Sequence, residues 1–149
     1  AGQAAGGDAR GKQSGGILVV KPIGDSGRTT DRWIDVRVDD HPTPFLEIRR
    51  LMNMSVSRNK TRLATQLASE GRFNEAIAAQ RKAIAMRPGN DQYVYGLARL
   101  HAQAGNTAGA VEVLSQAIVM NARWREQARS QADFDGISSD RRFRRLIGG

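Results

Sequence analysis

The hydrophobic pattern of the first third of the chain predicts two β-strands. Residues 16–20 form a short apolar run, rich in β-branched side chains and followed by Lys21-Pro22, which favours a buried strand over a helix. Residues 33–39 alternate apolar and charged side chains, so that the apolar ones share one face of a strand. The two segments are close in sequence, which predicts an antiparallel hairpin. Because a lone hairpin is only marginally stable, we expect a larger sheet or a helix to cover it.

A helix is predicted from Pro44 to about Met54. Thr43 is a residue type that caps helices, and proline is favoured at the first helical position, where its missing N–H would have no partner anyway. Apolar residues at helical spacing give this helix one hydrophobic stripe; they are Phe45, Ile48 and Met52. We expect the stripe to cover one face of the strand pair.

From Arg58 onward, apolar and small residues recur at a spacing of 34 residues, which indicates a repeat protein. Each unit is expected to form a helix, a short turn at Gly71 or Gly105, and a second helix. The residues in register are Leu63 with Leu97, Ala64 with Ala98, Gly71 with Gly105, Ala76 with Ala110, Ala83 with Ala117, and Ile84 with Ile118. Two units leave an apolar face open, so we expect the C-terminal segment to cap the stack. Its hydrophobic side chains are Trp124, Phe134, Phe143, Leu146 and Ile147.

Composition excludes several classes of protein. The 149 residues include no cysteine and two histidines, so we predict no disulfide, no metal site and no cofactor. No segment approaches the roughly 18 consecutive apolar residues of a membrane-spanning helix. The net charge is +8; residues 1–57 hold 8 basic and 7 acidic side chains, and residues 58–149 hold 15 and 8. The basic excess therefore belongs to the repeat region.

Arginines concentrate near the C-terminus, where a cationic cluster would attract the phosphates of a nucleic acid. They are Arg123, Arg125, Arg129, Arg141, Arg142, Arg144 and Arg145. Aromatic residues make up only 5% of the chain, and Phe134 and Phe143 suit a hydrophobic core better than base stacking. This composition argues against nucleic acid as the partner.

The repeat region resembles the tetratricopeptide repeat. The first copy carries Leu63, Ala64, Gly71, Phe73, Ala76, Ala83 and Pro88, and the second departs from the motif at His101, Thr107 and Ala122. The resemblance implies a superhelix whose inner helices line a concave, peptide-binding groove. By position in the motif, the groove residues are Arg58, Arg62, Thr65, Gln92, Tyr95, Arg99 and Gln103. Three arginines there favour an acidic peptide or a C-terminal carboxylate. The alternative is a solvated basic face, with another domain filling the groove.

The first third resembles a different family. Residues 1–14, the apolar strand after them and residues 35–42 are similar to the last part of the domain of unknown function 1028 family of bacteria and archaea. This resemblance implies the αββα sandwich of the N-terminal-nucleophile hydrolases. We therefore expect the α+β fold class, with two strands and a helix of such a sandwich in residues 1–57. An all-α tetratricopeptide superhelix would follow in residues 58–149, with repeats at about 58–91 and 92–125 and then capping helices.

The hydrolase resemblance implies cleavage of an amide bond by a terminal Thr, Ser or Cys. Ala1 has neither hydroxyl nor thiol, so we expect this chain to be the C-terminal portion of an amide hydrolase. The nucleophile and the rest of the sheet would come from a missing N-terminal part of the same protein or from a separate chain. The alternative is a non-enzymatic scaffold or peptide-binding protein. We also expect a homo-oligomer, and the absence of a signal-peptide pattern leaves the compartment open between cytoplasm and periplasm.

Two segments hold candidate substrate-site residues, while the catalytic residue stays unidentified. The glycine-rich loop presents Asp8, Arg10, Lys12, Gln13 and Ser14 ahead of the first strand; tight turns with an Asp8–Arg10 ion pair are the alternative. The second set comprises Arg37, Asp39, Asp40 and His41. Carboxylates and imidazole suit a substrate or a cation. The alternatives are a ladder of opposite charges along the strand and a cap for the following turn.

Overall fold

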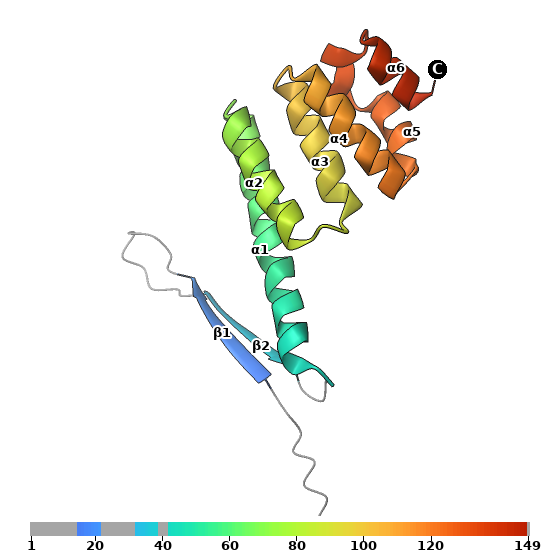
Figure 1. The fold of residues 1–149 in the computed structure, drawn as a ribbon. Coiled ribbons are helices and arrows are strands. Elements are labelled where there is room, and N and C mark those ends of the chain that lie inside the picture. The colour runs from blue at the N-terminus through green and yellow to red at the C-terminus, as the bar shows by residue number, and fades with distance from the viewer. Residues whose placement is uncertain (1–14, 22–31, 39–41, 149) are drawn as a thin grey trace, which may run out of the picture. The chain divides into compact units, whose positions relative to one another are not determined.

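A computed structural model describes residues 15–21, 32–38 and 42–148, with side chains from residue 42 onward. Its elements run from strand β1 to helix α6 (Figure 1). The chain divides into two compact units, Ala1–Met52 and Asn53–Gly149.

The first unit contains the strand pair and the start of the first helix. Strands β1 (Gly15–Lys21) and β2 (Arg32–Val38) pair with each other in the antiparallel direction, with Gly15 opposite Val38 and Lys21 opposite Arg32. These are the two segments in which the hydrophobic pattern indicates strands. In the described residues each strand has one neighbour, because the sheet contains only these two.

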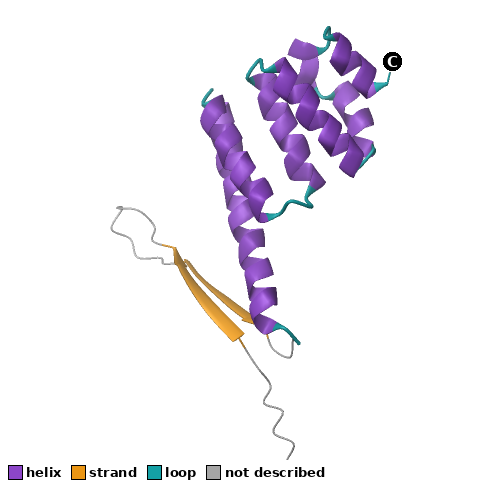
Figure 2. Cartoon of the chain, viewed as in Figure 1, coloured by secondary structure: helices purple, strands orange, loops and turns teal. Residues whose placement is uncertain are grey.

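The expected α+β fold class, with part of an αββα sandwich, is wrong for this chain. The described residues form no sandwich layer, since their sheet ends after one strand pair. Helices make up 82% of residues 42–148 (Figure 2). The physical reason is that helix-period apolar patterns dominate the rest of the chain, and no described segment supplies a further strand. The sandwich followed only from the family resemblance, not from the residues themselves.

Helix α1 (Pro44–Ser69) is longer than the sequence pattern predicts. The predicted end near Met54 is wrong, because no glycine or proline interrupts the chain between Pro44 and Gly71. Residues 57 and 58, between which we expected a domain boundary, lie inside this helix. Its C-terminal part belongs to the second unit.

The second unit consists of two helical hairpins followed by a C-terminal cap. The end of α1 and helix α2 (Phe73–Met86) form the first hairpin, and helices α3 (Asp91–Gln103) and α4 (Thr107–Met120) form the second. The turns contain Gly71 and Gly105, whose φ angles are 75° and 72°. That left-handed conformation favours glycine at both equivalent positions. Helix α5 (Arg123–Ser130), the 3₁₀ helix η1 (Ala132–Ile137) and helix α6 (Arg141–Ile147) complete the unit.

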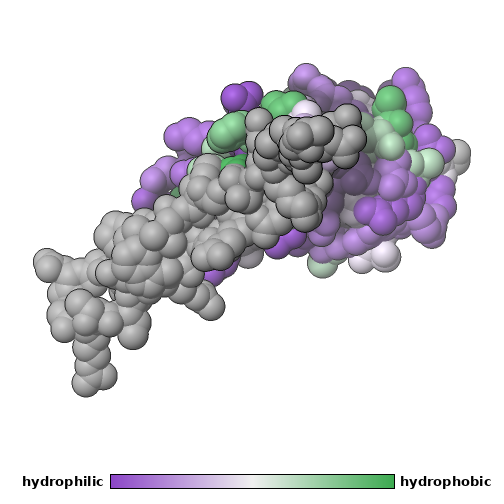
Figure 3. Space-filling view, turned by 90° about the horizontal axis from the view of Figure 1, so that it is seen from below, coloured by the Kyte–Doolittle hydropathy of each residue, from purple (hydrophilic) through white to green (hydrophobic). Residues whose placement is uncertain are grey.

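Small residues allow the helices of each hairpin to approach closely, as the repeat predicts. Four alanines in repeat register are completely buried: Ala76, Ala83, Ala110 and Ala117. The C-terminal segment packs on the second hairpin, because Trp124, Phe134 and Phe143 are buried in the same core as α3 and α4, with Leu146 and Ile147 packed against it. In Figure 3, hydrophilic side chains cover most of the visible coloured surface, with a few separate hydrophobic patches.

Candidate peptide-binding groove

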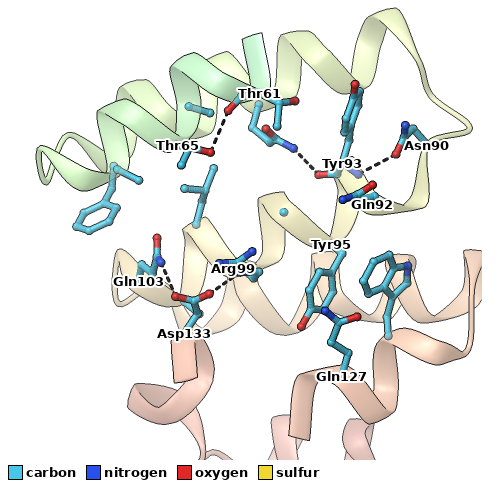
Figure 4. A pocket seen from close by; sticks show the side chains of 18 of the residues that line it. Thr61, Thr65, Asn90, Gln92, Tyr93, Tyr95, Arg99, Gln103, Gln127 and Asp133 are labelled. Carbon is cyan, nitrogen blue, oxygen red and sulfur yellow. Dashed lines mark hydrogen bonds and ion pairs between the residues drawn. The ribbon is translucent and has the colours of Figure 1, made fainter. Parts of the chain in front are cut away.

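The second unit contains one large groove, with a volume of about 1170 Å³, along helix α3. Side chains from α1, α2, α3, α5 and η1 line it (Figure 4). Six of the seven groove residues expected from the motif are among them: Arg58, Thr65, Gln92, Tyr95, Arg99 and Gln103. Repeat positions on successive inner helices thus meet at one surface.

Arg62 does not line the groove. On α1 the lining positions include Arg58, Thr61 and Thr65. At about 100° per residue, Arg62 lies on the side of Arg58 that faces away from Thr61. The expectation that Arg62 contributes to the groove is therefore wrong, because the rotation of α1 about its axis places its side chain outside.

An ion pair between Arg99 and Asp133 crosses from α3 to η1 within the groove. The same carboxylate accepts hydrogen bonds from Gln103 Nε2 at 2.5 Å and from Gln131 Nε2 at 2.8 Å. Burial by itself would raise the pKa of Asp133, but the hydrogen bonds from Arg99 and Gln103 and the charge of Arg99 outweigh burial, so the pKa is lowered. Asp133 is thus a carboxylate at neutral pH, and it compensates the charge of Arg99.

Tyr95 forms part of the groove wall through a buried aromatic contact. Its ring stacks on Trp124 with centroids 4.2 Å apart and meets Phe134 edge-on at 5.9 Å. The hydroxyl has no hydrogen-bond partner among the described residues, and Figure 4 shows that end of the ring pointing toward Gln127. Burial raises the pKa of Tyr95 to about 12. The phenol is therefore neutral at physiological pH, and it can donate or accept.

The remaining polar lining is mostly uncharged. Thr61, Thr65 and Ser69 line one wall, and Gln92, Gln103 and Gln127 are further lining residues. Hydroxyl and amide groups both donate and accept hydrogen bonds, so they match the alternating N–H and C=O groups of an extended peptide backbone. The charged lining residues are Arg58, Arg87, Arg99 and Asp133, which gives the described lining three positive charges and one negative charge.

Polar contacts on two sides hold helix α3 in place, one set with helix α2 and the other with the C-terminal cap. On the α2 side, the buried Gln80 donates from Nε2 to the backbone oxygen of Tyr93 at 2.7 Å. On the cap side, Asp91 accepts from Trp124 Nε1 at 3.0 Å and from Asn121 Nδ2 at 2.8 Å. Burial would raise the pKa of Asp91, but these hydrogen bonds outweigh it and the pKa is lowered. The groove wall is therefore held in place from both sides.

Most of the candidate substrate-site residues of the first third lie outside the described residues. These are Asp8, Arg10, Lys12, Gln13, Ser14, Asp39, Asp40 and His41. Arg37 lies in β2 opposite Gly16, and its side chain is not among those described. Their proposed role stays a prediction.

The described part of the chain holds no group of three His, Cys, Asp or Glu side chains suited to a metal ion. Among the same residues, no helix combines the length and apolarity needed to span a bilayer.

The C-terminal arginines are partly engaged within the protein. Arg129 pairs with Glu126 and donates to the backbone oxygens of Ile147 and Gly148, at 2.7 and 3.1 Å. Arg142 pairs with Asp140 at 3.1 Å. Arg129 thus links α5 to the end of α6, and Arg142 pairs at the start of α6.

Paired helices in repeat register, small residues at the crossings and an inner groove define a helical-repeat interaction module. Comparison with known families agrees: residues 67–133 match the tetratricopeptide repeat, and residues 1–48 match a family of unknown function (DUF1028). The combination indicated by the sequence motifs is thereby confirmed. No curated protein matches the chain. These matches support a tetratricopeptide protein-interaction module, and they do not support a hydrolase activity.

Proposed function

We propose that the groove of the second unit binds an extended peptide segment of a partner protein. The observation that carries this proposal is the lining, in which hydroxyl and amide side chains run along α1 and α3 on both sides of an open channel. The volume of about 1170 Å³ exceeds the roughly 300–1,000 Å³ of most small-molecule pockets. A peptide occupies such a channel better than a compact metabolite does.

The charge of the lining supports an acidic peptide. Three arginines and one aspartate leave an excess of two positive charges, in a region of the chain that carries 15 basic and 8 acidic residues. Opposite charge raises the rate of association and selects among partners more than it raises affinity. Binding is therefore expected to weaken as salt increases.

A steric block tests whether the groove is the binding site. Peptides would first be selected with the full chain from a randomised dodecapeptide library, and their affinity measured by fluorescence anisotropy. Thr65 is exposed and lines the groove, whereas Arg62 is exposed on the same helix outside it. We expect Thr65→Trp to weaken binding at least ten-fold and Arg62→Trp to leave it unchanged. Equal binding by both variants, or failure to select any peptide, contradicts the proposal.

Amide hydrolysis, a chain that completes the sheet, and a homo-oligomer stay predictions of the first third. The resemblance assigns hydrolysis to a nucleophile outside this chain, and the loop residues Asp8 to Ser14 lie outside the described part. A peptide-binding scaffold needs none of these. An amidase assay of this chain alone is expected to show no turnover, and measurable turnover contradicts that division of roles.

A further inference from the structure

The positive charges of the groove are not equivalent, because only one of them has a carboxylate partner. Arg99 is paired with Asp133. Arg58 and Arg87 have no carboxylate partner among the described residues. The excess positive charge of the lining therefore resides on these two side chains.

Arg58 and Arg87 both lie at the end of the groove that Tyr93 marks. Ser57, the neighbour of Arg58 on α1, has its Oγ 3.3 Å from the Tyr93 hydroxyl. The Arg87 guanidinium carbon lies 5.9 Å from the centroid of the Tyr93 ring, within the range of a cation–π contact. One buried ring thus contacts both Arg87 and the residue next to Arg58.

The opposite end of the groove is electrically neutral. There the Asp133 carboxylate accepts from Arg99, Gln103 and Gln131. A peptide carboxylate placed at that end would face Asp133, and the like charges would repel. An uncharged side chain meets no such penalty, and it can hydrogen-bond to Gln103.

The spacing of the two ends sets the spacing of the residues they recognise. Tyr93 marks the cationic end and Arg99 to Gln103 mark the neutral end, all on α3. At 1.5 Å per helical residue, the ends are about 9–15 Å apart along the axis of α3. An extended peptide advances about 3.3 Å per residue, so this span corresponds to roughly three to five peptide residues.

We infer that the groove reads a carboxylate at its Arg58–Arg87 end and an uncharged side chain roughly three to five residues away, at its Arg99–Asp133 end. This inference rests on the peptide-binding function proposed above. The carboxylate is that of an Asp or Glu side chain or of a peptide C-terminus, since both offer the same two acceptor oxygens to a guanidinium.

Charge reversal with a matched control tests the inference. Arg58→Glu and Arg62→Glu change the net charge equally and lie one turn apart on α1, but only Arg58 lines the groove. Peptides would be selected with the wild-type chain of 149 residues from randomised libraries with free and with amidated C-termini. We expect Arg58→Glu to lower the affinity for the selected acidic peptides at least ten-fold, and Arg62→Glu to change it less than two-fold.

Variants at Arg87 and Asp133 complete the test. Arg87→Gln removes the charge while keeping a polar side chain, and we expect it to lower the affinity for acidic peptides several-fold. Asp133→Asn is expected to let the groove also accept an acidic peptide residue at its Arg99–Asp133 end. Circular dichroism melting of each variant confirms that it is folded.

The outcomes distinguish failure of the peptide-binding function from failure of the assigned carboxylate site. If no peptide is selected, the peptide-binding function fails. If peptides bind but Arg58→Glu behaves like Arg62→Glu, the groove binds peptides and the assigned carboxylate site is wrong. Loss of binding on amidation identifies the C-terminal carboxylate as the recognised group. Equal binding of amidated peptides that contain Asp or Glu identifies the side chain instead.

Discussion

Arg99 on α3 and Asp133 on η1 form an ion pair in the groove lining and are separated by 34 residues, the spacing of the repeat itself. The two positions are therefore equivalent in successive units, one on α3 and the other on η1. The cation Arg99 in the second repeat is paired with the anion Asp133 in the C-terminal cap. This pairing links the cap to the repeat and at the same time sets the charge of the groove.

Removal of the Asp133 charge is expected to destabilise the protein and to flatten its acid dependence. Asp133→Asn should lower the free energy of unfolding by about 1 kcal/mol at pH 7, because Arg99 loses its charged partner. The folded-state pKa of Asp133 is lowered. Its contribution is therefore complete above the unfolded pKa of about 3.9 and is lost as the pH falls through the folded value.

Urea unfolding at pH 7 and pH 3 measures both effects. The variant should lose less stability between these pH values than the wild type does. Arg99→Met and the double variant complete a cycle that isolates the pair. Additive effects of the two substitutions would show that the pair contributes nothing to stability.

The Trp124 indole is expected to stabilise the cap through its N–H as well as its ring. Trp124→Phe keeps an aromatic ring beside Tyr95 but removes the hydrogen bond to Asp91, so the free energy of unfolding should fall by about 2 kcal/mol. Asp91→Asn retains an acceptor and should cost less. Urea denaturation followed by far-ultraviolet circular dichroism measures the difference. Equal stability of wild type and Trp124→Phe would contradict a role for the N–H.

The glycines of the two hairpin turns are required for their backbone conformation and not for space. A Cβ atom at Gly71 or Gly105 would meet no atom within 4 Å, but both residues have positive φ. Gly71→Ala and Gly105→Ala should each cost about 1–2 kcal/mol. Gly89→Ala is the control, because its surroundings are equally open and its φ is not positive. Thermal melting should rank Gly89→Ala at or above the wild type, and the other two below it.

His101 is expected to make the stability of the second unit sensitive to mild acid. Burial, together with the charge of Arg81, lowers the pKa of His101. Asn106 Nδ2 lies 3.2 Å from Nδ1 and can only donate, so the neutral ring carries its proton on Nε2. The unfolded chain takes up a proton near pH 6.5, whereas the folded chain does so at lower pH. Stability is therefore complete above about pH 6.5 and declines as the pH falls toward the folded pKa.

Nuclear magnetic resonance titration of the imidazole protons tests this prediction directly. His101→Gln identifies which of the two histidine signals belongs to position 101. The same variant should lose less stability than the wild type between pH 7.5 and pH 5.5. A His101 signal that titrates at or above about pH 6.5 would contradict the argument from burial.

Local patterns accounted for most of the helical architecture. The spacing of Gly71 and Gly105 located both turns, and the alanines in register located the helix crossings. The predicted end of α1 near Met54 was wrong because it followed the last residue of the apolar stripe, whereas the helix ends at a backbone signal, Gly71. The sandwich was wrong because it depended on a larger sheet, and the described part of the chain contains only one strand pair.

The groove was predicted in part. Six of its residues follow from their position on the inner helices, but Asp133, Arg87, Trp124 and Gln127 were not assigned to it. One signal for Asp133 was available, since it lies 34 residues after Arg99 and continues the repeat register. No comparable signal marks Arg87, which follows the last residue of α2.

By itself the sequence determined the repeat, its turns and the residues of its core, because periodicity and backbone preference are local properties of the chain. Only the tertiary structure decided the electrostatics of the groove. The rotation of α1 about its axis places Arg62 outside the groove. The charge of Arg99 is compensated by Asp133, which η1 positions beside it. Contacts between distant segments decide which charges remain uncompensated. Of the three arginines expected in the groove, only Arg58 lines it without a carboxylate partner among the described residues, and Arg87 is a second such arginine.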